Sequence, residues 1–308
     1  MWSLAARRGT EPISQLRFRP LASTNDTMTG WKRHIVFVLG VVAAAAACVA
    51  AISFTISPRG TIGPTLLQAQ SPAAAVIAVS LGLMGATIVG AIVGRLTNAL
   101  VGLFIVGAGL GALAFRFGSI GDLAFANGSL MFLAVETVIF SVLVLLSTYV
   151  VYKIAGPLED IDPPEDDYNK TKSLFLSAAA ALIMLPIVWF IATSELRGQT
   201  LAATFFGCML AGLASRLIAP NTQPKLIFAT ACLVGAVGHV YGAYVVGTNI
   251  ESAFIQETIP ALSMPLPIDY AAGALMGVSM GLGWARSFLH HEQDETSQAS
   301  AASVPQKL

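Results

Sequence analysis

Long apolar runs separated by short polar segments dominate this chain of 308 residues. Each run holds close to the ~20 apolar residues that a helix needs to cross about 30 Å of hydrocarbon. We therefore predict eight spanning helices, at residues 34–56, 73–94, 98–117, 129–152, 173–193, 199–218, 226–246 and 268–289. The expected fold class is an all-α polytopic membrane helix bundle, with the lipid bilayer as its first partner.

Composition and the placement of basic residues refine this picture. The chain is 55% hydrophobic and 11% charged, with a mean hydropathy of +0.73, whereas soluble domains are about 25% charged. An even number of spans puts both termini on one side, and only Arg59, Arg116 and Arg197 then fall on the other side. Because Lys and Arg near span ends are retained in the cytoplasm, we predict cytoplasmic termini in a bacterial cytoplasmic membrane. An organellar inner membrane is the alternative.

Polar segments divide the chain into five predicted parts. They are an N-terminal cytoplasmic segment at 1–33, a four-helix membrane unit at 34–152, an acidic cytoplasmic linker at 153–172, a second four-helix unit at 173–289 and a disordered tail at 290–308. The arginine-rich composition of residues 1–27 is typical of an organellar presequence. Translation starting at Met28, just before the first apolar run, explains the same residues equally well, so both interpretations stay open.

Two of the predicted spans carry the same pattern of small residues. The first row is Gly82, Ala86, Gly90 and Gly94 before Arg95-Leu96, and the second is Ala203, Gly207, Ala211 and Ser215 before Arg216-Leu217. Residues 103–118 also align with 227–242 without a gap. We infer a duplicated four-helix unit, and it is a parallel repeat because four helices return the chain to its starting side. Chance is the competing explanation, since the chain contains 28 glycines.

Rows of small residues also predict where helices touch. Spacing by four puts the small side chains on one helix face, where backbones approach closely in lipid. Besides the two repeated rows, Gly273, Gly277 and Gly281 form such a row in the last span. We therefore expect tight helix contacts along all three rows, and a bulky residue at Gly90 or Gly277 is expected to disrupt them.

Three ionisable residues within or beside the spans are the candidate functional site. A charge left in hydrocarbon costs about 3 kcal/mol or more unless it is paired or hydrated. Glu136 and His239 share a depth of roughly 10 Å at a rise of 1.5 Å per residue, and Arg116 lies near the same surface. A cluster of these three would suit proton exchange or anion recognition, because histidine titrates near neutrality. The competing interpretation is that each makes only a structural hydrogen bond.

Catalytic, metal and nucleic-acid motifs are largely missing from the sequence. The acidic linker lacks the glycine and terminal glutamate of a calcium-binding EF-hand loop. The sequence also has no basic patch interleaved with aromatic residues of the kind that binds nucleic acid. The run Gly277-Val278-Ser279-Met280-Gly281 fits the G-x-S-x-G pattern of serine hydrolases, but that motif requires a strand-to-helix turn. We therefore expect no enzyme activity, no cofactor and no metal.

Two hypotheses about function follow from these observations. The small-residue faces and the shortage of polar groups within the spans favour a non-enzymatic accessory or scaffolding subunit, bound to a membrane-protein partner or to copies of itself. The duplication and the shared depth of Glu136 and His239 favour a small permease, in which the two side chains would carry protons. A hydrated cavity at Glu136 and His239 would support the permease, whereas a solid bundle with an exposed small-residue face would support the accessory subunit.

Overall fold

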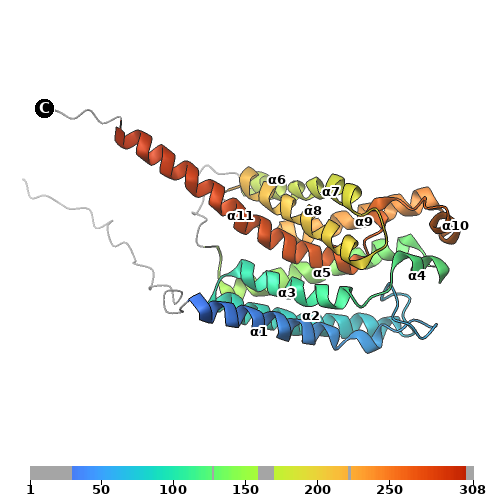
Figure 1. Ribbon diagram of the computed structural model, residues 1–308. Coiled ribbons are helices and arrows are strands. Elements are labelled where there is room, and N and C mark those ends of the chain that lie inside the picture. The colour runs from blue at the N-terminus through green and yellow to red at the C-terminus, as the bar shows by residue number, and fades with distance from the viewer. Residues whose placement is uncertain (1–29, 127, 159–169, 221–222, 303–308) are drawn as a thin grey trace, which may run out of the picture.

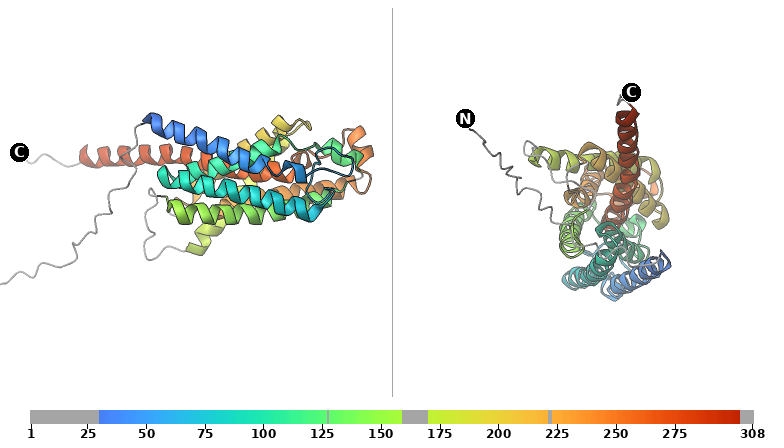
Figure 2. Two further views of the ribbon diagram at one scale, coloured as in Figure 1. Left: turned by 90° about the horizontal axis from the view of Figure 1, so that it is seen from below. Right: turned by 90° about the vertical axis from the view of Figure 1, so that its left-hand side faces the viewer.

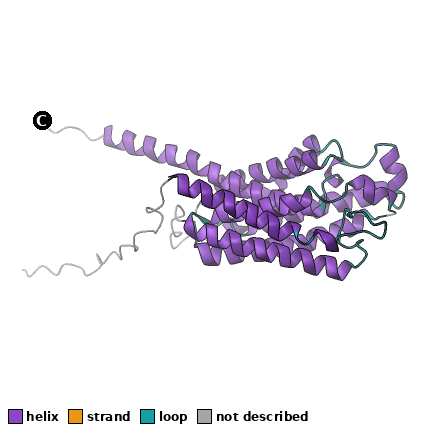
Figure 3. Cartoon of the chain, turned by 60° about the horizontal axis from the view of Figure 1, so that its bottom comes forward, coloured by secondary structure: helices purple, strands orange, loops and turns teal. Residues whose placement is uncertain are grey.

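The computed structural model describes residues 30–126, 128–158, 170–220 and 223–302, with the backbone alone for residue 170 and for 289–302. Regular structure within these ranges is helical (Figure 3). A lone antiparallel bridge joins Ile56 and Ile62 in a loop. Most of the predicted N-terminal segment, most of the acidic linker and the end of the tail lie outside the described residues.

The helices follow the apolar runs of the sequence closely. The first half contains α1 (Gly30–Val49), α2 (Pro72–Leu96), α3 (Ala99–Ala114) and α5 (Leu130–Ala155), with the short helices η3 (Ile52–Phe54) and α4 (Ile120–Phe125) in loops. The second half contains α6 (Lys170–Ala179), η4 (Ala180–Ile183), α7 (Met184–Ile191), α8 (Arg197–Ile218), α9 (Leu226–Val246), α10 (Ile250–Ile255), η5 (Ala261–Ser263) and α11 (Pro267–Ala302). We call the end where α1 begins and α11 leaves the bundle the terminal end, and the opposite end the distal end (Figure 1).

Six helical segments among the described residues are long and apolar enough to cross a membrane. They are Gly30–Phe54, Pro72–Leu96, Leu130–Ala155, Thr171–Ile191, Arg197–Ile218 and Leu226–Val246. The chain is therefore a multi-pass integral membrane protein. The remaining two predicted spans correspond to α3, an apolar helix of 16 residues, and to α11, which continues past the expected end at residue 289. The count of eight spans stays a prediction, because α3 alone extends only about 24 Å at 1.5 Å per residue.

Local sequence accounts for several helix boundaries. Asn98 precedes α3, and its Oδ1 accepts a hydrogen bond from Val101 N at 2.9 Å; Ser129 does the same for Met131 N before α5. Such side chains replace the partners that the first helical N–H groups lack. In the fifth predicted span, the 3-10 turn η4 separates α6 from α7 just before Pro186. Proline clashes with the carbonyl four residues earlier, which explains this interruption.

The two halves pack side by side, as the end view in Figure 2 shows. In the first half α1, α2 and α3 contact one another, and in the second half α11 packs along α8. Between the halves, α3 contacts α11 and α5 contacts α9. The third predicted span of the first half, α3, thus meets the fourth of the second half, α11. The fourth span of the first half, α5, likewise meets the third of the second half, α9. A duplicated unit related by a pseudo-two-fold axis would pack in this way, although α2 and α3 are much closer than α8 and α9. The duplication therefore stays a prediction.

Glycines from the first small-residue row lie at helix contacts within the first half. A methyl group built on Gly90 would lie 2.5 Å from the Gly102 carbonyl oxygen of α3. On Gly82 it would lie 2.9 Å from the Ala47 carbonyl oxygen of α1, and on Gly94 3.1 Å from Ala155 Cβ. Ala86 of the same row is buried. The backbones are therefore close enough that side chains would not fit between them.

The last row joins α11 to α8. A methyl group on Gly273 would meet Thr204, one on Gly277 would overlap the Phe205 carbonyl oxygen, and one on Gly281 would overlap the Met209 carbonyl oxygen. In the second row, Gly207 lies against Met184 at the start of α7. Its other members are buried side chains, namely Ala203, Ala211 and Ser215. These rows are thus largely used inside the chain.

Candidate functional site

Glu136 is buried near the distal end of α5 and holds a loop in place. Its Oε2 accepts hydrogen bonds from Leu66 N at 2.9 Å and Leu67 N at 3.4 Å, and from the Thr65 hydroxyl. These donors belong to the loop between η3 and α2, which folds into the distal end so far that Thr65 and Leu66 are buried. Glu136 Oε1 has no hydrogen-bond partner among the described residues. The carboxyl group therefore anchors the loop through one oxygen.

His239 is buried on α9 at a similar depth but has different partners. Its Nε2 lies 2.9 Å from the Pro265 carbonyl oxygen, which only accepts, so Nε2 carries a hydrogen. Its Nδ1 lies 3.0 Å from the Thr137 hydroxyl of α5. The ring also meets Tyr270 edge-on, with centroids 5.5 Å apart. His239 thus links α9 to α5, to the segment before α11 and to α11 itself.

The structure does not bring Glu136, His239 and Arg116 together as one cluster. Glu136 bonds the loop before α2, and its neighbour Thr137 is the residue that meets His239. Successive residues of an α-helix point about 100° apart, since 3.6 residues make one turn, so equal depth did not imply a shared direction. Arg116 lies exposed beyond the end of α3. The depth of these side chains along their helices could be predicted from the sequence, but the direction in which each side chain points could not.

An ion pair that we did not predict from the sequence lies at the distal end of the bundle. Arg197, at the start of α8, donates to Asp269 of α11 through Nη1 at 2.8 Å and Nη2 at 2.5 Å. The same guanidinium donates to the Ala114 carbonyl oxygen at the end of α3. Asp269 also accepts from Leu266 N at 2.8 Å, as an acid in the first helical turn often does. Pro267 followed by Asp269 is a helix-start signal that marks this acid in the sequence.

A second acid ties the two halves together at the distal end. Glu195, between α7 and α8, accepts from the Ser119 hydroxyl at 2.6 Å and from Gly121 N at 3.1 Å. Ser119 and Gly121 belong to the start of α4 in the first half. Asp122 completes this start, because its Oδ2 accepts from Ser119 N at 2.7 Å. Glu195 therefore fixes the start of a helix in the opposite half, and Asp122 fixes the start of its own helix.

These contacts limit the chemistry of the predicted site. Glu136, His239 and Asp269 each bond groups of the fold, and no three acid, cysteine or histidine residues of the described ranges gather as metal ligands would. Ser279, from the G-x-S-x-G match, lies within α11 and donates to Leu275 O of the same helix at 2.7 Å. The cysteines Cys48, Cys208 and Cys232 are buried free thiols. This arrangement supports structural roles for all of these residues.

A surface groove between α1 and α2 is a further candidate. It has a volume of about 530 Å³ and lies in the distal half of both helices. Ala47 of α1 and Ala50, just after its end, line one wall, and Ala74, Ala78 and Gly82 of α2 line the other. Phe54, Ile77 and Leu81 also line the groove and are exposed, and every lining side chain is apolar. Ala50 is exposed, so this small-residue groove is open at the surface of the bundle.

No protein-family model matches this chain, and neither a curated protein nor a solved structure does. The interpretation of the site therefore depends on the geometry alone.

Proposed function

We propose that this protein is a non-enzymatic accessory subunit that binds a transmembrane helix of another membrane protein in the groove between α1 and α2. The observation that carries the proposal is the small-residue lining of that groove. Ala74, Ala78 and Gly82 are spaced by four, so they share one face of α2. Ala47 of α1 and Ala50, just after the end of α1, lie across from them.

The lining favours a helix over a polar ligand. Helices in a bilayer associate through dispersion and close backbone approach, because lipid tails are as apolar as the side chains themselves. Small side chains allow this approach, and the rims at Ile77 and Leu81 can pack along the sides of an inserted helix. A polar substrate would find no hydrogen-bonding side chain here. The groove therefore has the composition of a helix interface.

A different chain suits the groove better than a second copy of this one. A symmetric dimer places the same patch of each copy against itself, so the patch has to be self-complementary. Two grooves that face each other are both concave and would leave a gap where Ala78 meets its counterpart. A single protruding helix fills the same space with contacts. We therefore assign a partner helix rather than a homodimer.

The permease remains the alternative, with less support from the geometry. Proton transfer between Glu136 and His239 needs a direct or water-linked path, and each side chain instead bonds a separate part of the fold.

The positions of the basic residues among the described side chains support the topology that both hypotheses share. Arg59, Arg116 and Arg197 lie at the distal end, whereas the terminal end carries Lys32, Arg33, Arg95, Lys153, Lys172, Arg216, Lys225 and Arg286. By the positive-inside rule the terminal end is cytoplasmic.

The proposal is tested by filling the groove. Ala78→Leu adds a large side chain to the lining, and Val142→Leu, on the exposed face of α5, is the control. The mass of the assembly released from native membranes by a mild detergent is measured for both variants. We expect Ala78→Leu to lose the partner and Val142→Leu to keep it. Equal masses for both variants and the unchanged protein would contradict the proposal, and a mass that fits two copies of this chain would replace the partner with a homodimer.

A further inference from the structure

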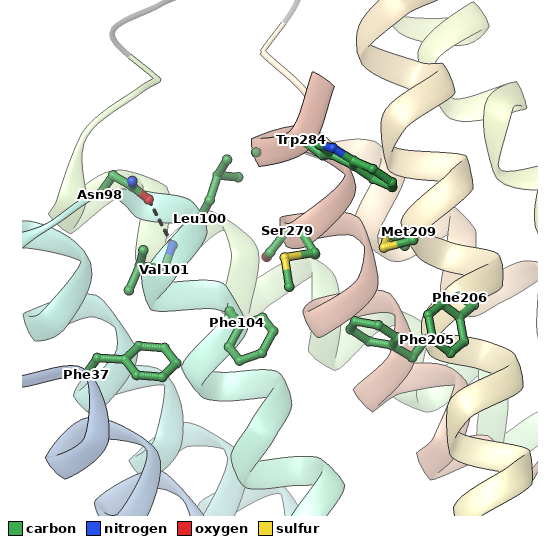
Figure 4. A pocket seen from close by; sticks show the side chains of 12 residues that line it. Phe37, Asn98, Leu100, Val101, Phe104, Phe205, Phe206, Met209, Ser279 and Trp284 are labelled. Carbon is green, nitrogen blue, oxygen red and sulfur yellow. Dashed lines mark hydrogen bonds between the residues drawn. The ribbon is translucent and has the colours of Figure 1, made fainter. Parts of the chain in front are cut away.

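A second groove, of about 730 Å³, lies on the other side of α1, between α3 and the pair α8 and α11 (Figure 4). Its walls are large side chains, with Phe37 and Phe104 on one side and Phe205, Phe206 and Trp284 on the other. It occupies the half of the bundle near the terminal end, because α3 begins there, directly after Asn98, and Trp284 lies in the part of α11 that approaches this end. Its volume lies within the roughly 300–1,000 Å³ that is common for small-molecule sites.

The lining indicates an apolar chain as the occupant of this groove. Its polar groups are those of Asn98 and Ser279 and the indole N–H of Trp284. Asn98 Oδ1 accepts a hydrogen bond from Val101 N at 2.9 Å, and the Ser279 hydroxyl donates to Leu275 O at 2.7 Å. A partner helix is disfavoured, because bulky aromatic walls keep a second backbone from approaching closely. A flexible hydrocarbon chain fits between such rings without needing a polar contact. Trp284 is 51% exposed, so the groove opens toward the lipid.

Basic residues lie just beyond the groove at the terminal end. Arg33 precedes Phe37 by four residues on α1, and Arg286 follows Gly283, a lining residue, by three on α11. Residues three or four apart are neighbours on a helix surface. A guanidinium has five donors in a planar fork, so it can bind a phosphate while keeping another partner. The rim therefore places positive charge where a lipid headgroup would lie if its tail filled the groove.

We propose that this groove binds one anionic phospholipid, with an acyl chain between Phe104 and Phe205 and its phosphate at Arg33 and Arg286. Basic pockets between transmembrane helices select anionic headgroups through this combination of charge and depth. The Asn98 side-chain amide, exposed at the mouth of the groove, has donors for the same headgroup. The site is separate from the groove between α1 and α2, so its test does not depend on the proposed function.

Trp284 is a built-in reporter for the test. A protein with Trp284 as its only tryptophan, made by W2F, W31F and W189F, is placed in nanodiscs of phosphatidylcholine. A small fraction of phosphatidylglycerol with brominated acyl chains, or the same fraction of brominated phosphatidylcholine, is then added, and quenching of the fluorescence is compared. We expect the anionic lipid to quench the fluorescence more strongly than the phosphatidylcholine does. Arg286→Gln and Arg33→Gln are each expected to lower this preference for the anionic lipid about fivefold, because one basic side chain near an anionic surface contributes an effect of this size. Arg116→Gln, at the distal end, is the control and is expected to leave the preference unchanged.

Filling the groove separates a site from general attraction to the bilayer surface. A methyl group built on Gly283 meets nothing within 4 Å, so a side chain can start there, and we expect the leucine of Gly283→Leu to extend into the groove that Gly283 lines. We expect this variant to lose the preference for the anionic lipid while keeping its thermal stability. Equal quenching by both lipids in the unchanged protein, or a preference that persists in Gly283→Leu, would overturn the proposal. So would a polypeptide that leaves the purified protein in Gly283→Leu, since a protein would then occupy the groove.

Discussion

Two glycines of α11 allow the packing of α11 on α8 to be tested with a matched pair. A methyl group on Gly281 would overlap the Met209 carbonyl oxygen of α8 and lie 2.8 Å from Leu213 N. On Gly283 it would meet nothing within 4 Å. Because the atoms near Gly281 belong to the backbone, a change of rotamer cannot make room. Gly281→Ala therefore forces the two helices apart, and Gly283→Ala does not.

The expected size of the effect follows from two terms. Alanine is favoured over glycine in a helix interior by about 0.8–1 kcal/mol, and both variants gain this amount. Overpacking a tight contact costs about 1–3 kcal/mol, and only Gly281→Ala incurs it. The propensity term cancels in the comparison, so Gly281→Ala is expected to be less stable than Gly283→Ala by about 1–3 kcal/mol.

The buried cysteines make this difference measurable in detergent. Cys48, Cys208 and Cys232 are free and buried, so a thiol-reactive fluorophore labels them only as the protein unfolds on heating. Gly281→Ala is expected to label at a lower temperature than the unchanged protein, and Gly283→Ala at the same or a higher one. Identical unfolding temperatures for the two variants would show that α8 and α11 do not pack as described.

Three further predictions concern the distal end and the topology. Asp269→Ala leaves the Arg197 guanidinium, 15% exposed, without its carboxylate, and the same unfolding assay is expected to show a loss of about 3–5 kcal/mol; Arg116→Ala should change stability by less than about 0.5 kcal/mol, and equal losses would refute the pair's role. Glu136→Ala removes the acceptor of three donors and is expected to cost at least about 1–3 kcal/mol, whereas Glu136→Gln keeps an acceptor oxygen and should cost less; the reverse order in thermal unfolding would contradict the anchoring role. If α3 spans the membrane, Arg95→Cys and Arg116→Cys will react with an impermeant thiol reagent from opposite sides, and labelling from one side would reduce the number of spans.

The sequence predicted the helices well because their signal is local. An apolar run with a cap such as Asn98 or a proline such as Pro72 fixes a helix with little help from the rest of the chain. Small residues spaced by four likewise mark faces where helices can approach. Which helix meets each face depends on the tertiary arrangement, so Gly82 and Gly90 of one row lie against different helices, α1 and α3.

The candidate site was harder to predict because its partners lie far apart in the chain. Glu136 bonds a loop that precedes it by about 70 residues, and Arg197 meets Asp269 across 72 residues. The depth of a side chain along its helix contains no information about the direction in which it points around that helix. The loop before α2 has no strong periodic pattern either, so its sequence does not predict that Leu66 is buried beside Glu136.

A photo-activated crosslinker in place of Ala50 tests the central claim most directly. Ala50 is exposed and lines the groove between α1 and α2, and Val142, on the exposed face of α5, is the matched lipid-facing control. Irradiation is carried out in native membranes, and the masses of the adducts are determined. The account predicts that Ala50 forms an adduct with one other membrane protein, that Val142 does not, and that Ala78→Leu removes the adduct. Adducts with lipid alone at both positions would contradict the account.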